Sequence, residues 1–595
     1  MSDATGLAAP AAPAPRQLPS PLRRASEAFA VVAIVAAAWA ALQGFALSRA
    51  PFHTRGEPRE AVVVQDLVRR GDWILPRRNG AALPRKPPLF YWLAAVAARA
   101  RGGVDEASVR LPSAVLSGVA CALLAAVTTV IYGALSGTVS GLTLLTSFEW
   151  LRAATTARVD MTLAFGLALA FAGLLLFRRV EHPAWLLLVY AGAAWATLSK
   201  GIPGLVIPIV QVLLLCAVVD RSFAFARRLR PLSGLLAVLT VSGLWYAAAA
   251  VRGGRDFVSI VVDENLVRAL GTSHFALGHR HSIVYLVFAL LAGLLPWTVL
   301  LPSVAVSLWR DRRGMGRCDP RRFAILWIVA VFALYAFATS KRGVYLLPLY
   351  PAVCLLVGWW AAQAVRGRVE PRWLLRVLAP LAWVLAAVLA LLAVVAGAQA
   401  AGLPLLDSAA SLFGPRPAFD LACVAAAVRD HAGLALCLAM AAAAAAALAS
   451  GARARRCGVA LASLFVGTAA VIIAVRAVVL PAIGEGYTRR PFAAALRRAV
   501  ADPLAVHTTD SLDYGTLFYW DAAMPVYDPK GGGDVPPYLL SPEAAWLRMS
   551  AAERLHYRRL PGLRVEHGGD QGYVAVLQRR EEADPHPAAV RQADP

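Results

Sequence analysis

Long apolar runs separated by short basic segments fill most of the first 480 residues of the chain. A run of about 20 apolar residues crosses the hydrocarbon core of a bilayer. Thirteen runs are therefore predicted to be membrane spans, at about 29–47, 111–132, 136–152, 161–178, 185–199, 203–219, 232–251, 282–307, 323–340, 344–365, 377–400, 432–451 and 458–481. Residues 88–101 are apolar but shorter, so we expect an interfacial helix there. The pattern predicts a polytopic α-helical membrane protein.

The two ends of the chain lack this pattern. Residues 1–25 are rich in Ala and Pro and are predicted to be a disordered cytoplasmic tail. Residues 26–481 form the expected transmembrane domain, within which the proline-containing segment 401–431 is predicted to be an exposed loop. After Pro481, helix-like and strand-like pieces alternate, which indicates a small soluble α/β domain over 482–595 with a frayed C-terminus.

Composition agrees with a membrane protein, since hydrophobic residues make up 59% of the chain and charged residues only 16%. The net charge of +23 would suggest nucleic-acid binding in a soluble protein. Here the basic residues lie mainly in short loops, where they set the orientation of the spans. We therefore expect membrane lipids, and not nucleic acid, as partners. The seven cysteines show no CxxC or zinc spacing, so neither a disulfide framework nor a structural metal is predicted.

The basic loops also predict which segments share a membrane face. Arg23 and Arg24 precede the first span and place the N-terminus in the cytoplasm by the positive-inside rule. Threading the spans from there leaves the other Arg-rich loops in the cytoplasm. The opposite face then receives five polar segments, namely 49–110, 153–160, 199–201, 252–281 and 340–342. These segments hold most of the acidic residues outside the tails, so distant parts of the sequence are expected to meet at one surface.

A set of short motifs in those segments has a known counterpart. In order they read GEPREA, GDWILPRRNG, KPPLFYW, ARVDM, SKGIPG, DENLVR, PW and KRGVYLLPLYP, between about residues 28 and 352. This series resembles the bacterial GT-C glycosyltransferases, which include the lipid A aminoarabinose transferase and protein O-mannosyltransferases. The resemblance implies an inverting transferase at the periplasmic face of the bacterial inner membrane. Its donor would be a polyprenyl-phosphate sugar, and its acceptor a lipid A, glycan, lipid or protein group.

Three acids are candidates for the catalytic carboxylate that takes the acceptor proton: Glu57, Glu60 and Asp160. The family commonly begins its first motif with Asp then Glu, but this chain has Gly56 in place of the Asp. Glu57 is then the expected base, although an acid in a first helical turn also has a purely structural explanation. Glu60 could equally lie on a helix surface. Asp160 enters the membrane at a loop end, where acids are costly and usually functional, but it could simply pair with Arg158.

The resemblance also implies cationic contacts to the departing lipid phosphate. The predicted donor-phosphate residues are Arg59, Lys86, Lys200, Arg268, Lys341, Arg342 and Tyr345. Glu264 and Asn265, in the DENLVR motif, are further expected site residues. Cations on the outer face run against the positive-inside trend, so they need another reason. Simple alternatives exist: Lys86 can snorkel, Arg59 can pair with a nearby Glu, and Tyr345 can belong to an aromatic belt.

No cofactor is expected, because the lipid-linked sugar is a substrate. His274, His279 and His281 lie close together in the sequence, but no carboxylate accompanies them at a metal-ligand spacing. We therefore predict no metal site.

Two other functions fit a many-helical chain with charged residues at membrane depth. A transporter or flippase of a lipid-linked anion is one, although such proteins commonly show paired repeats, and we find none here. A non-catalytic GT-C-like protein is the other, because Gly56 stands where the family has its usual acid.

Overall fold

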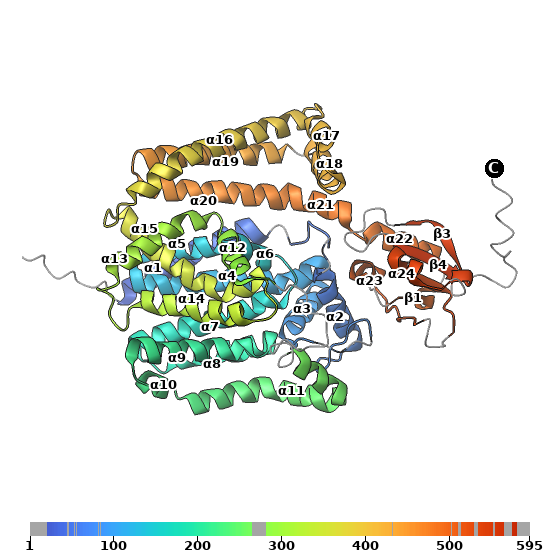
Figure 1. Cartoon of the computed structure of the whole chain (residues 1–595), viewed down its shortest axis with the longest axis horizontal. Coiled ribbons are helices and arrows are strands. Elements are labelled where there is room, and N and C mark those ends of the chain that lie inside the picture. The colour runs from blue at the N-terminus through green and yellow to red at the C-terminus, as the bar shows by residue number, and fades with distance from the viewer. Residues whose placement is uncertain are drawn as a thin grey trace, which may run out of the picture.

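The computed structural model describes residues 21–44, 47–52, 54, 56–80, 83, 85–264, 281–430, 432–500, 502–509, 513–528, 534–550, 554–564 and 574–579 of the 595-residue chain. Its helices form a bundle of roughly parallel rods, and a small α/β domain lies beyond one end of that bundle (Figure 1). The predicted fold class is confirmed.

Ten helices in the described part of the chain are long and apolar enough to cross a membrane. They are built from α1 (Pro21–Trp39) with η1 (Ala40–Gly44), α4 (Glu106–Tyr132), α7 (Val159–Val180), α9 (Pro203–Leu214) with η2 (Leu215–Asp220), α11 (Pro231–Val262), α14 (Pro320–Phe337), η5 (Gly343–Leu349) with α15 (Tyr350–Val365), α16 (Arg372–Ala400), α19 (Gly433–Arg453), and α20 (Cys457–Ala474) with η6 (Val475–Val479), α21 (Leu480–Tyr487) and α22 (Arg490–Ala499). An eleventh span would combine α12 (Ile283–Gly293) with η4 (Trp297–Leu300) and α13 (Leu301–Asp311), which meet at 102°.

Two of the thirteen predicted spans correspond to shorter helices. These are α5 (Ala134–Thr146), with 13 residues, and α8 (Ala184–Lys200), with 17 residues. At a rise of 1.5 Å per residue they are about 20 and 26 Å long, whereas the hydrocarbon core is about 30 Å thick. The count of thirteen spans stays a prediction.

The centre of the bundle is formed by α7 and the η5–α15 segment, whose residues are nearly all buried. Both are apolar on every side, as expected of helices surrounded by other helices. Close packing depends on small residues: a Cβ atom on Gly166 of α7 would lie 2.8 Å from the backbone of α8 at Gly192. Trp327 of α14 is fully buried and donates a hydrogen bond to the Pro348 carbonyl at 2.8 Å.

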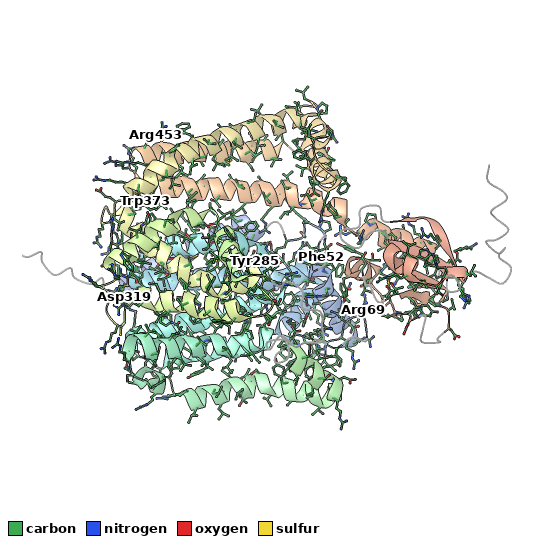
Figure 2. All side chains as sticks on the ribbon, in the orientation of Figure 1. Phe52, Arg69, Tyr285, Asp319, Trp373 and Arg453 are labelled. Carbon is green, nitrogen blue, oxygen red and sulfur yellow. The ribbon has the colours of Figure 1, made fainter. Side chains whose placement is uncertain are left out.

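The basic loops collect at the end of the bundle away from the α/β domain, where Figure 2 shows Arg453, Trp373 and Asp319. Helix α10 (Ala224–Arg228) also lies there. Ion pairs join several of these loops: Arg178 binds Asp220 at 2.6 Å, and Arg228 pairs with Glu181. Loops far apart in sequence therefore meet at one end, as the predicted threading requires.

Two helices of the first long polar segment cover the opposite end of the bundle. Helix α2 (Gly56–Arg70) is followed by α3 (Leu89–Arg101), and α6 (Phe148–Ala154) lies nearby. The predicted short helix over 88–101 is confirmed as α3, which ends at Gly102 in a left-handed conformation with φ 83°. The break in α11 at Gly254, with φ 60°, falls on the same side of the bundle.

The C-terminal domain contains a four-stranded sheet in the order β1-β2-β4-β3. The strands are β1 (Val506–Thr508), β2 (Tyr538–Pro542), β3 (Tyr557–Arg564) and β4 (Val574–Arg579), and the accompanying helices are η7 (Pro503–Ala505), α23 (Tyr514–Trp520) and α24 (Glu543–Arg548). β1 pairs with β2 in parallel, and the other pairs are antiparallel. The helix-like and strand-like pieces expected after Pro481 are present and include α22, β1 and β4.

The domain docks on α2 through α23. The Phe52 ring lies 4.9 Å from that of Phe518, and the Gln65 amide donates to the Phe518 carbonyl at 3.0 Å. The Tyr519 hydroxyl accepts from the Phe52 backbone at 3.0 Å and donates to Glu106 at 2.6 Å. Residues more than 400 positions apart in the sequence thus form one polar and apolar interface.

One expectation for the connecting segments was wrong. Residues 401–431 were expected to be a loop because of their prolines, but they contain α17 (Leu405–Ala410) and α18 (Pro415–Asp430). Proline is tolerated at the first position of a helix, and Pro415 occupies that position in α18. Asp407 accepts hydrogen bonds from Gln399 and Arg429, both at 2.7 Å, and so holds the two short helices to the end of α16.

Candidate active site

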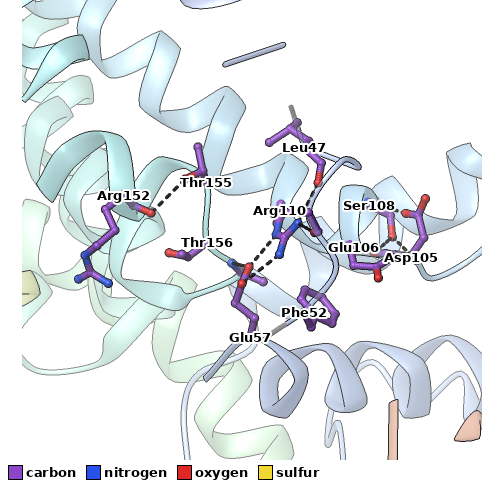
Figure 3. A network of polar contacts seen from close by, with 12 residues as sticks. Leu47, Phe52, Glu57, Asp105, Glu106, Ser108, Arg110, Arg152, Thr155 and Thr156 are labelled. Carbon is purple, nitrogen blue, oxygen red and sulfur yellow. Dashed lines mark hydrogen bonds and ion pairs between the residues drawn. The ribbon is translucent and has the colours of Figure 1, made fainter. Parts of the chain in front are cut away.

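Glu57 lies in the first turn of α2 and is almost completely buried, with 2% of its surface exposed. Its carboxylate accepts two hydrogen bonds from Arg110, at 2.7 and 3.0 Å, and one from the Ala157 backbone at 3.1 Å (Figure 3). Arg110 also donates to the carbonyls of Leu47 and Ala50. Glu57 therefore ties α2 to α4 and to the segment that leads into α7.

Eight of the predicted site residues line one cavity of about 440 Å³ between α2, α3, α7, α8 and η5. They are Arg59, Glu60, Lys86, Asp160, Lys200, Glu264, Arg342 and Tyr345. We call this space the inner cavity. The predicted convergence of distant polar segments is thus present in the fold.

Asp160 and Lys200 form an ion pair that lines the inner cavity. Asp160 lies in the first turn of α7 and Lys200 ends α8, so each charge lies at the helix end that favours it. Their side chains are 2.5 Å apart and are each only 11% exposed. The Lys200 ammonium also lies 4.1 Å from the centre of the Tyr345 ring, a cation–π contact.

Glu60 lies on the wall of the inner cavity and is held by two donors. Arg59 binds it at 2.6 Å, and the Tyr91 hydroxyl donates to it at 2.6 Å. The Glu60 charge raises the pKa of Arg59. Burial raises the pKa of Tyr91 well above its ordinary value, and the same carboxylate adds to the rise. Both donors therefore keep their protons at neutral pH.

Lys86 also has a carboxylate partner, because its ammonium contacts Glu264 from the end of the α11 region. Lys341 has a backbone partner instead. Its ammonium donates to the Ala338 carbonyl at 2.7 Å, and it is not among the described residues that line the inner cavity. Asn265 and Arg268, together with His274 and His279, lie outside the described residues.

A second cavity, of about 990 Å³, adjoins the inner one; we call it the outer cavity. Arg59, Arg158, Arg342 and Tyr514 line both cavities, so these four residues mark their junction. The outer cavity reaches α6, α12 and the C-terminal domain. Glu57 lines neither cavity among the described residues, so it would have to leave Arg110 to reach a substrate.

Arg158 takes the space that a side chain at position 56 would need. A Cβ atom built on Gly56 would lie 2.2 Å from Nη2 of Arg158. In the described part of the chain no carboxylate lies within ion-pair distance of Arg158, and the buried Nε of Arg342 has no hydrogen-bond partner. The junction therefore presents two guanidinium groups that form no ion pair with a described carboxylate.

Several site residues were not recognised from the sequence. Arg158 belongs to the ARVDM motif and could have been chosen on that ground, but it was considered only as a partner of Asp160. Arg78 and Arg85 belong to the first long polar segment and also line the inner cavity. Tyr514 comes from the C-terminal domain, and no local sequence signal connects it with the membrane helices. Among the described residues, no group of three His, Cys, Asp or Glu could hold a metal ion.

Comparison with known proteins agrees with this architecture. Residues 85–246 match the family described as dolichyl-phosphate-mannose-protein mannosyltransferase. The undecaprenyl phosphate-alpha-4-amino-4-deoxy-L-arabinose arabinosyl transferase 1 of Sodalis glossinidius is 27% identical over 323 residues, which are 53% of this chain and 56% of that protein. The corresponding transferase of Pectobacterium carotovorum is 27% identical over 322 residues, 52% and 56% of the two chains.

The crystal structure of ArnT from Cupriavidus metallidurans bound to undecaprenyl phosphate has the same fold. It matches with a TM-score of 0.70 at 20% identity and covers 94% of this chain and 99% of that one. The apo form of the same protein matches with a TM-score of 0.68 at 20% identity, over 93% and 98% of the two chains. The sequence matches span only about half the length of the curated relatives. The resemblance to GT-C polyprenyl-phosphate-sugar glycosyltransferases, inferred from the motifs, is confirmed.

Proposed function

We propose that this multi-pass membrane protein is an inverting glycosyltransferase. It moves a sugar from a polyprenyl-phosphate donor to a hydroxyl or phosphate acceptor at the periplasmic face of the bacterial inner membrane. The observation that carries the proposal is the inner cavity, where cationic and acidic residues from five polar segments meet at one end of the bundle. The names of the relatives, which act on an undecaprenyl phosphate sugar, support the donor class.

The donor phosphate is assigned to the cations of the inner cavity. Lys86, Lys200 and Arg342 line it with Arg59, and a lipid phosphate there would meet ammonium and guanidinium donors. The matching ArnT crystal structure holds bound undecaprenyl phosphate, which supports a lipid phosphate as the ligand. Glu264 is assigned the role of holding Lys86 when the site is empty.

The reaction follows from this placement. An acceptor oxygen attacks the anomeric carbon from the face opposite the phosphate, and the bond between that carbon and the phosphate oxygen breaks. The electron pair leaves with the lipid phosphate, where the cations stabilise the charge. The proton of a hydroxyl acceptor passes to a carboxylate. Asp160 is favoured as this base over Glu57 because it lines the inner cavity, whereas Glu57 is enclosed by Arg110 and the Ala157 amide.

The periplasmic location rests on the distribution of charge. The basic loops gather at the end of the bundle away from both cavities, as the positive-inside rule requires of the cytoplasmic side (Figure 2). The resemblance to GT-C transferases supports a reaction without a metal cofactor, so chelation with EDTA is expected to leave turnover unchanged.

The test is a transfer assay with purified protein. Undecaprenyl phosphates carrying 4-amino-4-deoxy-L-arabinose or a hexose are incubated with candidate acceptors, and released undecaprenyl phosphate is measured by mass spectrometry. Asp160→Asn is expected to lower turnover by about 10²–10⁴-fold, the usual contribution of a general base. Lys86→Gln is expected to lower it by about tenfold or more, as loss of a charge-assisted contact does.

Two controls make the assay decisive. Arg453→Gln, at the far end of the bundle, is expected to keep the activity of the unmodified protein. Glu57→Gln distinguishes the two acids. If it lowers turnover more than Asp160→Asn does, while thermal stability is unchanged, Glu57 and not Asp160 is the base. Absence of release from every donor, with movement of the lipid across vesicles instead, would favour a transporter.

A further inference from the structure

The C-terminal domain supplies one wall of the outer cavity. Its contribution consists of Tyr487, Arg489, Asp513, Tyr514 and Gly515, from the end of α21, the start of α22 and the start of α23. The remaining walls come from the membrane domain, which offers aromatic residues on α6 and α12. The cavity is therefore complete only when the two domains are docked.

Arg489 is the buried cation in that wall. It is only 8% exposed, and its Nε lies 2.9 Å from Oδ2 of Asp513. Its Nη1 is also buried, yet it has no hydrogen-bond partner among the described residues. A buried guanidinium donor without a partner is costly, so such a group calls for an acceptor that the protein alone does not provide.

Asp513 holds this arginine in place, and its carboxylate oxygens are already bound by donors of the protein. Its carboxylate accepts from the Gly515 backbone at 3.1 Å and from the Thr516 hydroxyl at 2.8 Å, besides the contact with Arg489. The pair is locked at the N-terminus of α23. Nη1 of Arg489 is therefore left without a partner among the described residues, in a side chain that lines the outer cavity.

The charges around the outer cavity are unbalanced. Among the described residues, five arginines and two carboxylates, Glu149 and Asp513, line it, and one of the arginines, Arg59, is paired with Glu60 outside the cavity lining. Glu149 is held by two nitrogens of Arg152, at 2.5 and 2.8 Å, and Asp513 is held by Arg489. The excess positive charge favours a ligand that carries anionic oxygen atoms.

The same cavity has an apolar flank. Phe148 of α6 and Phe288 of α12 line it, and they are 54% and 66% exposed. Helix α12 belongs to the bent pair of helices that together are long and apolar enough to form one membrane span, so an apolar chain of a ligand can pack on these exposed rings. The ligand of the outer cavity thus has an anionic headgroup and an apolar tail.

We infer that the outer cavity binds the acceptor, an amphiphile with a phosphate or carboxylate headgroup, and that Arg489 of the C-terminal domain is a binding residue for that headgroup. This assignment rests on the proposed function, in which the donor fills the inner cavity. The four residues shared by the two cavities bring the acceptor headgroup next to the donor sugar. The C-terminal domain then selects the acceptor, while the membrane domain holds the donor.

The test measures the binding of defined lipids to the full chain by native mass spectrometry in detergent. Diphosphoryl lipid A presents phosphate, monoglucuronosyl diacylglycerol presents carboxylate, and monogalactosyl diacylglycerol is the neutral counterpart of the latter. Undecaprenyl phosphate reports on the inner cavity. The variants are Arg489→Gln and Asp513→Asn, and Arg498→Gln is the control because Arg498 is exposed on α22.

At least one anionic lipid is expected to bind more tightly than the neutral lipid. Arg489→Gln is expected to weaken the binding of that lipid by about tenfold and to change the affinity for undecaprenyl phosphate by less than about twofold. Arg489→Lys is expected to recover part of the lost affinity. The control Arg498→Gln is expected to bind the lipid as tightly as the unmodified protein. Equal binding of neutral and anionic lipids, or an equal loss for anionic lipid and undecaprenyl phosphate, would overturn the assignment. Failure of the unmodified protein to bind undecaprenyl phosphate would instead refute the proposed function.

Discussion

The contact between Gly56 and Arg158 decides what the junction of the two cavities presents to a ligand. The guanidinium occupies the space of a side chain at position 56. The sequence therefore lacks a carboxylate at this position and gains an arginine in its place. Glycine is needed here for space, because its φ has no unusual value.

Gly56→Ala is expected to displace the end of the Arg158 side chain, because the new Cβ would otherwise lie 2.2 Å from Nη2. The fold should tolerate this movement, since the displaced atoms are the far end of a flexible side chain. We expect undecaprenyl phosphate to bind several-fold more weakly, as measured by native mass spectrometry, with little change in thermal stability.

Gly103→Ala is the matched control, because nothing lies within 4 Å of a Cβ at that glycine. Gly56→Asp tests the same contact in the opposite sense, since its carboxylate would lie beside Arg158 and neutralise it. If Gly56→Ala bound the lipid as tightly as the unmodified protein, Arg158 would have no part in the site.

At the scale of elements, hydropathy was sufficient to predict the helix bundle and α3, because the length of an apolar run determines whether it can cross the membrane. The inner cavity was also predictable, since charge in the short loops fixes which polar segments face the same side. The outer cavity was not predictable. Arg489 and Tyr514 reach it only because α23 docks on α2, and this contact joins residues more than 400 positions apart. The pair of Glu57 and Arg110 was missed because it joins α2 to α4 across 53 positions of the sequence.

The docking of α23 on the membrane domain is expected to depend on the Tyr519 hydroxyl. Tyr519→Phe removes its hydrogen bonds to the Phe52 backbone and to Glu106, the latter a buried carboxylate. A loss of about 1–3 kcal/mol in docking free energy is expected. Limited proteolysis should then cut near α22 more rapidly than in the unmodified protein.

Tyr527→Phe, in the same domain, serves as the control and is expected to leave the cleavage rate unchanged. The pH dependence gives a second check. Burial, with help from the Glu106 carboxylate, raises the pKa of Tyr519 to about 12. Its contribution to docking is therefore fully present below about pH 10, the ordinary tyrosine value, and is lost as the pH rises towards 12. Loosening of the domain between about pH 6 and 9 would have to come from another group.

At the scale of the whole molecule, the basic end and the end with the cavities are expected to lie on opposite sides of the membrane. The exposed Arg368 belongs to the first and the exposed Arg498 to the second. In a background without the seven native cysteines, Arg498→Cys should react with an impermeant maleimide in spheroplasts. Arg368→Cys should react only after the membrane is opened. The reverse result would place both cavities in the cytoplasm.

The wall of arginines common to the two cavities makes their occupancy interdependent. A negative ligand on one side neutralises part of the positive potential that would attract a negative ligand on the other, so each is expected to weaken the other's affinity by the same factor. Once the sugar has been transferred, the released lipid carries the full charge of a phosphate monoester. It then interacts most strongly with the shared arginines. Formation of the fully charged lipid phosphate should therefore hasten the release of the product beside it, and the product that remains should then leave more slowly than the first.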